Sequence, residues 1–244
     1  LGDLDLDRVE MARLGRRVEN DFLDVQSGIM DQFASLHGGR DQLVYLDCRT
    51  LEWERLPLPE GTSVLVVDSG VRRRLVDGAF NDRRAECEEA LAILRQDHPE
   101  LLALRDLDLE RLERAVERLE PRLARRVRHV VEECARVQRG GEVLRRGGAA
   151  ADLGELMIAS HASSRDLYEV SIPEIDLIVD AVSATRGCHG ARLSGAGFGG
   201  CATALIDSAA AEKTATAVTA SFEERFGRRP QIHHCSIDLG AAVE

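Results

Sequence analysis

Apolar residues recur every three or four positions through much of this chain, and such spacing places them on one face of a helix. Met11, Leu14 and Val18 begin the pattern, with Asp7 and Glu10 in the positions of a capping box, which predicts a helix over 7–20. The same spacing, bounded by glycine and proline, predicts several further helices. Their ranges are 27–39, 81–96, 109–119, 123–141, 152–168, 173–187 and an alanine-rich stretch ending near residue 226.

Strands are predicted where apolar runs are short and rich in β-branched or aromatic residues. Two such segments cover 42–48 and 51–58, and the compact run SVLVVDS over 63–69 suits a strand buried on both faces. A glycine loop leads into a strand over 201–206, and 231–238 forms the last strand. Because helices and strands are mixed without regular βαβ alternation, the sequence predicts an α+β fold with a two-layer sandwich toward its C-terminal end.

Composition and charge narrow the classes of partner. The 244 residues are 44% hydrophobic, enough for a real core, and carry a formal net charge of -11. Such a charge repels a phosphate backbone, and 4% aromatic residues offer few stacking platforms, so we expect no nucleic acid partner. Apolar runs stay well short of the roughly 20 residues that cross a bilayer, and the first residues are acidic, so we expect a cytoplasmic setting without membrane contact.

Several familiar site types are excluded by residue counts and spacing. The six cysteines are widely spaced and form no CxxC, which favours reduced, buried thiols over a disulfide framework or zinc ribbon. Lys213 is the only lysine, so there is no GxxxxGK[ST] phosphate loop. His233 and His234 are adjacent on the expected last strand and point to opposite faces, so they cannot share a metal ion.

Asp31 is the first candidate for chemistry. It falls in the opening turn of the helix over 27–39, which we expect Ser27 to cap, near the positive end of the helix dipole. Gly28 just before it would let a ligand approach the main chain. The alternative is purely structural, because an acidic residue in a first turn stabilises a helix by about 0.3–1 kcal/mol without any catalytic role.

The second candidate is a dense glycine loop, LSGAGFGGC, which contains Gly195, Gly197, Gly199 and Gly200. Such a loop allows consecutive backbone amides to converge on an anion. It leads into a strand, however, and so lacks the helix N-terminus of a dinucleotide fingerprint. A tight turn beside a sheet edge is the structural alternative.

The third candidate is the polar cluster SHASSRDLYEVSIPE at the end of the helix over 152–168. A helix end facing a cleft could present these groups to a sugar or phosphate. His161 within it could act as a base, although a capped or hydrogen-bonded core histidine is the favoured interpretation.

Taken in order, the three segments resemble the galactokinases, which belong to the GHMP family of small-molecule kinases. VENDFLDVQSGIMDQFASLHG is similar to the stretch around that family's catalytic aspartate, and SHASSRDLYEVSIPEID is similar to a galactokinase helix signature. ARLSGAGFGGC resembles the family's third motif, a glycine-rich loop near the nucleotide phosphates and the sugar. The similarity continues through VVDSGVRRRLVDGAFNDRRAECEEA.

The resemblance implies ATP-dependent phosphorylation of galactose at the anomeric hydroxyl, giving galactose 1-phosphate, with Mg²⁺ bridging the phosphates. Asp31 would then act as the base or as an orienting charge. Gly28 and Phe80 would line the sugar pocket beside Asp31, and the four loop glycines would lie near the nucleotide. These roles require Asp31 to face the turn between residues 195 and 200 across one cavity.

Two motifs of the family are absent from this sequence: PGRVNLIGEHTDY, and the GLSSSA loop that wraps the ATP phosphates. We therefore expect the chain to be the C-terminal part of a longer galactokinase, or a truncated relative, and to lack activity alone. The resemblance implies a two-lobed GHMP kinase fold. Residues 1–70 would be the tail of an incomplete N-terminal lobe, and 71–244 a two-layer, ferredoxin-like C-terminal lobe with an added helical hairpin. The active site would lie between the lobes.

Phe80 departs from the family in a second way. Galactokinases commonly place there a tyrosine whose hydroxyl contacts the sugar, so the resemblance leaves the sugar open. Relatives acting on arabinose or N-acetylgalactosamine share much of this pattern. A non-catalytic sensor of sugar or nucleotide is the rival from another class, although Asp31 favours an enzyme.

Overall fold

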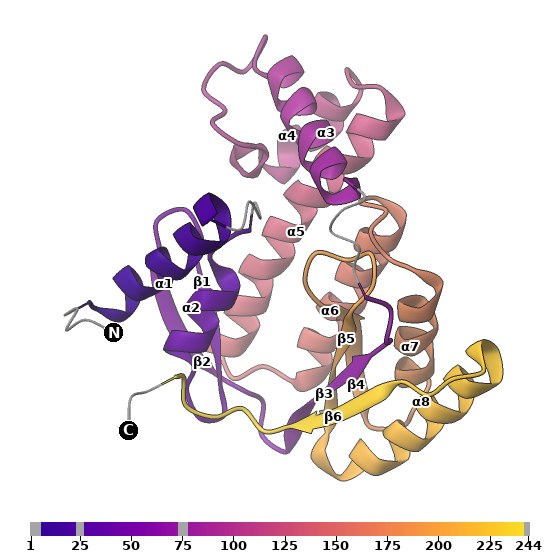
Figure 1. Cartoon of the computed structure of the whole chain (residues 1–244). Coiled ribbons are helices and arrows are strands. Elements are labelled where there is room, and N and C mark those ends of the chain that lie inside the picture. The colour runs from indigo at the N-terminus through magenta and orange to yellow at the C-terminus, as the bar shows by residue number, and fades with distance from the viewer. Residues whose placement is uncertain (1–5, 23–26, 73–77, 242–244) are drawn as a thin grey trace. The chain divides into compact units, whose positions relative to one another are not determined.

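The computed structural model describes residues 6–22, 27–72 and 78–241, and the chain divides into two compact units (Figure 1). The first unit consists of Leu1–Glu60 together with Ser236–Glu244, and the second consists of Gly61–Cys235. The strand that follows Glu60 pairs within the second unit, which accounts for the division between these units at residue 61. The division into lobes at residue 70 stays a prediction. The last residues of the chain return to the first unit.

The first unit pairs two helices with a β-hairpin. Helix α1 (Arg8–Arg17) begins with the expected capping box of Asp7 and Glu10, and one π-helical turn (Val18–Phe22) continues it. Helix α2 spans Met30–His37, and strands β1 (Gln42–Leu46) and β2 (Trp53–Pro57) pair antiparallel. The small core of this unit is built on Ala12, Ile29 and Phe33.

The C-terminal segment completes the first unit through backbone hydrogen bonds. The amide of Asp41 donates to the carbonyl of Ile237 at 3.1 Å, and the amide of Ala241 donates to Ser35 at 2.7 Å. The strand expected over 231–238 therefore ends at Cys235, and the residues after it pair with the first unit instead.

The second unit contains a four-stranded antiparallel sheet in the order β4-β5-β3-β6. The strands span Thr62–Asp68 (β3), Cys188–Leu193 (β4), Cys201–Asp207 (β5) and Gln231–Cys235 (β6). Burial alternates along β3, so the prediction of a strand buried on both faces is wrong. Helices α7 (Pro173–Ser183) and α8 (Ala211–Phe226) pack on the sheet and form its core through residues such as Ile178 and Phe222.

Helices form the remainder of the second unit. They are α3 (Ala79–Leu94), α4 (Leu109–Val116), α5 (Pro121–Arg145) and α6 (Ala150–Asp166), with short 3₁₀ turns at Leu104–Asp106 and Ser208–Ala210. A second core lies where α3, α4 and α5 meet (Figure 1). Helix α5 runs straight through Gly140 and Gly141, where the sequence predicts an end. Gly140 instead lies against Leu153 and Leu156 of α6.

Helix α6 lies along the outer edge of β4. A side chain at Gly154 of α6 would collide with the backbone of His189, and one at Gly190 would collide with Gly154 in turn. Both glycines are therefore required by the close approach of a helix to a strand. The contact covers the edge of the sheet at the strand that leads into the glycine loop.

Candidate active site

Asp31 lies in the first turn of α2, as the sequence predicts, and is exposed. The buried side chains of Ile29 and Phe33 hold this turn in the first unit. The expected cap by Ser27 is wrong: the helix begins after Ile29 without a side-chain cap, and the Ser27 hydroxyl donates to Glu19 instead. A carboxylate in this uncapped first turn interacts favourably with the positive end of the helix dipole and stabilises the helix. Its catalytic role stays a prediction.

Gly28 precedes that turn and is exposed. A Cβ built at this position would meet none of the described residues within 4 Å, so packing against its neighbours does not require glycine there. Phe80 belongs to the second unit, where it is half-buried in the first turn of α3 after Gly78 in left-handed conformation. The sugar-binding roles of Gly28 and Phe80 stay predictions, as does the cavity shared by Asp31 and the glycine loop.

The glycine loop connects β4 to β5 in the second unit. All four of its glycines adopt positive φ, from 75° at Gly195 to 126° at Gly199, a region where other residues are strained. Side chains at Gly197 and Gly199 would also collide with the carbonyls of Val170 and Val71 respectively. The loop conformation thus depends on glycine for both backbone geometry and space.

Two segments hold the loop by main-chain hydrogen bonds. The amide of Phe198 donates to Val170 at 2.7 Å, and the amide of Gly200 donates to Val71 at 2.9 Å. The carbonyl of Gly200 accepts from both the amide and the hydroxyl of Ser69, at 3.0 and 2.7 Å. Two of the loop amides are therefore engaged within the protein, and the expectation that consecutive amides converge on an anion does not extend to them.

The polar cluster over 160–169 is internal only in part: its histidine and serines are buried, whereas Arg165, Asp166 and Glu169 are exposed. Ser160 is buried and donates to Glu133 at 2.7 Å, and the Ser163 hydroxyl lies 2.9 Å from Nδ1 of His129. His161 is 3% exposed and accepts a hydrogen bond from the amide of Leu193, which confirms the interpretation as a core histidine. The buried members of the cluster therefore serve the packing of the second unit.

A charged network lies behind this cluster, and the sequence reasoning above misses it. Arg126 of α5 is 1% exposed and donates to Glu86, Glu169 and the carbonyl of Leu167. Burial alone would raise the pKa of Glu86, but hydrogen bonds from Arg126 and Arg83 outweigh it and lower that pKa to about 2. The signal available in the sequence is an arginine within the apolar stripe of residues 123–130.

Burial also shifts the pKa values of Tyr168 and of the groups around it. It raises the pKa of the Tyr168 hydroxyl and that of the Cys87 thiol, which lies 3.9 Å from the hydroxyl oxygen. The His129 ring stacks on Tyr168 with 4.3 Å between centroids, and burial lowers its pKa to about 4. These groups are uncharged at neutral pH because burial disfavours their charged forms.

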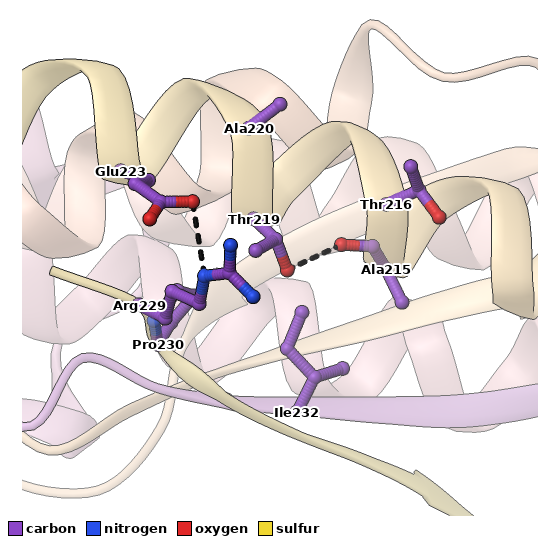
Figure 2. A pocket seen from close by; sticks show the side chains of 8 residues that line it. All are labelled: Ala215, Thr216, Thr219, Ala220, Glu223, Arg229, Pro230 and Ile232. Atoms are coloured by element: carbon purple, nitrogen blue, oxygen red, sulfur yellow. Dashed lines mark hydrogen bonds and ion pairs between the residues drawn. The ribbon is translucent and has the colours of Figure 1, made fainter.

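A shallow groove of about 540 Å³ lies between α8 and β6 in the second unit (Figure 2). Its charged residues, Glu223 and Arg229, pair with each other at 3.0 Å, and the hydroxyls of Thr216 and Thr219 donate to carbonyls of their own helix. The other lining residues are Ala215, Ala220, Pro230 and Ile232. The groove thus presents few polar groups to a ligand.

Within the described residues, no helix is both long and apolar enough to span a bilayer. The same part of the chain contains no group of three or more His, Cys, Asp or Glu side chains arranged to hold a metal ion.

Comparison with known proteins identifies the family. Residues 1–39 match the model of the GHMP kinase N-terminal domain, and residues 142–224 match that of the GHMP kinase C-terminal domain. The fold agrees, since the chain resembles a homoserine kinase from Cytophaga hutchinsonii with a TM-score of 0.58 at 14% identity, covering 97% of this chain and 60% of that one. The chain therefore belongs to the GHMP kinase family.

Within that family the chain is similar to galactokinases. It is 39% identical to the galactokinase of Roseiflexus sp. (strain RS-1) over 95% of this chain and 59% of that protein. It also resembles the crystal structure of Lactococcus lactis galactokinase complexed with galactose, with a TM-score of 0.91, 33% identity, and coverage of 98% of this chain and 61% of that one. The chain thus spans about three fifths of the length of these relatives.

Proposed function

We propose that the enzyme to which this chain corresponds transfers the terminal phosphoryl group of ATP to the anomeric hydroxyl of galactose, giving galactose 1-phosphate and ADP. The observation that carries the proposal is the 39% identity to a galactokinase over 95% of the chain. The similar Lactococcus lactis galactokinase has a structure that contains galactose, which supports a sugar as the acceptor. The cytoplasm is the proposed compartment.

Asp31 is the proposed catalytic residue. In phosphoryl transfer the sugar oxygen attacks the γ-phosphorus as the bond from that phosphorus to the leaving ADP oxygen breaks, and the hydroxyl proton must go elsewhere. The Asp31 carboxylate is exposed, and the buried residues Ile29 and Phe33 hold the helical turn that carries it. It can therefore accept that proton or orient the hydroxyl. Gly28 and Phe80 are the proposed neighbours of the sugar.

The glycine loop is the proposed contact with the nucleotide phosphates. Because the amides of Phe198 and Gly200 already donate to protein carbonyls, the proposal assigns phosphate contact mainly to the exposed start of the loop at Gly195. Gly197 and Gly199 then serve to keep that start in place by packing closely on Val170 and Val71. Gly200 serves the same end through Ser69.

Mg²⁺ is a further proposed component. Magnesium in kinases commonly uses one or two carboxylates together with substrate phosphates, so the lack of a three-residue metal cluster among the described residues is compatible with it. When bound with ATP, Mg²⁺ would neutralise charge on the phosphates.

The test of the proposed function is the substitution Asp31→Asn, which keeps the size of the side chain and removes its charge. We expect kcat for galactose to fall by about 10² to 10⁴, the usual contribution of a positioned base. The assay follows ADP release from the enzyme that carries these residues, with galactose, arabinose and N-acetylgalactosamine as acceptors. Glu212→Gln, which alters another exposed acid in a first helical turn, is the matched control and should leave kcat unchanged.

Near-normal turnover in the Asp31→Asn enzyme would reject the role of Asp31. Phosphorylation of one of the other sugars in preference to galactose would correct the substrate and keep the kinase. Binding of galactose and ATP without any ADP release by the unsubstituted enzyme would favour the sensor over the kinase.

A further inference from the structure

The amide of Leu193 lies at the point where strand β4 gives way to the glycine loop. Strand β4 is one of the two edge strands of the sheet, and helix α6 covers its outer side. His161 of α6 accepts a hydrogen bond there, with 3.3 Å between its Nδ1 and the amide nitrogen of Leu193. A side chain of the helix thus takes the place that a neighbouring strand would have in the sheet.

This contact determines the protonation state of the imidazole. A backbone amide can only donate, so Nδ1 must be unprotonated, and the neutral ring then carries its proton on Nε2. Nε2 lies 3.3 Å from Oδ1 of Asp176, at an angle that does not form a hydrogen bond within the described structure, so their interaction is chiefly electrostatic. Ser171 donates to the same Oδ1 at 2.5 Å and fixes the carboxylate.

The segment that contains Ser171 and Asp176 also contacts the glycine loop, at a position after Leu193 in the sequence. Val170, which directly precedes Ser171, accepts the amide of Phe198 at 2.7 Å and leaves no room for a side chain at Gly197. The segment from Val170 to Asp176 therefore holds the middle of the loop and orients His161, which holds its start. The exposed Gly195 lies between these two points of attachment.

We propose that His161 is a positioning residue for the glycine loop: its neutral imidazole fixes the amide of Leu193 and thereby the orientation in which the loop meets a nucleotide phosphate. The second half of this inference rests on the proposed function. His161 itself is buried and touches no substrate in this scheme.

We expect the hydrogen bond between His161 and Leu193, and with it the position of the loop, to depend on pH. Burial lowers the pKa of His161. The carboxylates of Asp176 and Asp180 in α7 act to raise this pKa, whereas Arg165 of α6 and Arg192 of β4 act to lower it. The net pKa is below its ordinary value, so the acceptor is present at neutral pH. Protonation at lower pH would turn Nδ1 into a donor that faces the donor of Leu193, and the start of the loop would be released.

The test compares two substitutions at this position in the 244-residue chain. His161→Asn keeps an acceptor oxygen close to the place of Nδ1, whereas His161→Leu fills the space without an acceptor. His234→Leu is the matched control, because His234 contacts the Ser63 hydroxyl in the same sheet rather than the loop. Amide hydrogen exchange by ¹⁵N NMR reports on Leu193, Phe198 and Gly200, and calorimetry reports the Kd for ATP.

We expect His161→Leu to speed exchange at Leu193 at least 10-fold and to weaken ATP binding about 10-fold. His161→Asn should stay within about 3-fold of the unsubstituted chain in both measurements, and His234→Leu should leave both unchanged. Equal exchange in His161→Leu and the unsubstituted chain, or equal effects of the Asn and Leu substitutions, would overturn the proposal.

Two further results keep the inference separate from the proposed function. If the unsubstituted chain binds no ATP while Leu193 exchange responds as expected, the positioning of the loop stands and its nucleotide role fails. If His161→Leu does not fold, the ring nitrogens of the unsubstituted chain decide the matter by long-range ¹⁵N correlation. An unprotonated Nδ1 that gains a proton together with loss of Leu193 protection supports the proposal, and a protonated Nδ1 at neutral pH refutes it.

Discussion

Phe80 is the single residue that offers the sharpest test of sugar preference. Its ring is half-buried in the first turn of α3, so a hydroxyl could be added without opening the core. A hydrogen bond to a sugar hydroxyl contributes about 0.5–1.5 kcal/mol, which corresponds to a factor of about 2 to 10 in binding. We expect Phe80→Tyr to raise kcat/KM for galactose by that factor, measured beside arabinose and N-acetylgalactosamine.

Phe22→Tyr is the control for Phe80, since Phe22 is 83% exposed and belongs to the other unit. It should change none of the three efficiencies. An unchanged ratio between galactose and the other sugars in Phe80→Tyr would place Phe80 outside the sugar site.

Residue positions could be predicted where the causes are local. The capping box of Asp7 and the first-turn position of Asp31 follow from neighbours three or four positions away, and both are confirmed. The prediction that Ser27 caps the helix is wrong because Ser27 donates its hydrogen bonds to Asn20 and Glu19 instead. The partner of His161 lies 32 positions away at Leu193, a distance at which spacing alone gives no information.

At the scale of elements, the packing around α6 predicts opposite effects on stability when two helical glycines are replaced by alanine. Gly154→Ala would drive a methyl group into the backbone of His189, and overpacking of this kind costs about 1–3 kcal/mol. Gly140→Ala places its methyl 3.6 Å from Leu153, an ordinary contact, and alanine favours a helix over glycine by about 0.5–1 kcal/mol. Urea unfolding of the two variants measures both free energies.

The matched pair controls for helix propensity, since both changes replace glycine by alanine within a helix. Equal stability of the two variants would mean that α6 can move away from β4 at little cost. The loop contacts of His161, which is on the same helix, would then be expected to loosen in Gly154→Ala as well.

The order of elements was largely accessible from the pattern of the sequence, whereas their packing was not. Helices over 109–119 and 173–187 are found as α4 and α7, with Pro173 in the first turn of α7 as expected. The end of α5 was misplaced because Gly140 and Gly141 are buried inside the helix and form no turn. The alternating burial of β3 arises because Leu65 and Val67 face the core formed with α7 and α8, and residues 63–69 alone do not reveal which face those helices cover.

At the scale of the whole molecule, His129 predicts how stability responds to acid. Burial lowers its pKa from 6.5 to about 4, so between these values the unfolded chain binds a proton that the folded chain does not. The free energy of unfolding therefore falls as the pH drops from about 6.5 to about 4, with a slope of up to about 1.4 kcal/mol per pH unit from this group. Chemical unfolding at a series of pH values measures the slope.

His129→Gln should flatten that dependence, whereas His233→Gln, at an exposed position of β6, should not. Below about pH 4.5 carboxylates such as Glu86, whose folded pKa is about 2, add their own loss of stability. An identical pH profile in His129→Gln and the unsubstituted chain would show that His129 is protonated alike in the folded and unfolded states.

The return of the last residues to the first unit has a consequence for synthesis. Arg40 and Asp238 interact across 198 positions of sequence, and every residue of the second unit is translated between them. At about 5–20 residues per second, the amide of Asp41 waits roughly 10 to 40 s on the ribosome for the carbonyl of Ile237. The second unit can thus mature first, and the nascent first unit lacks this contact until Ile237 has been translated.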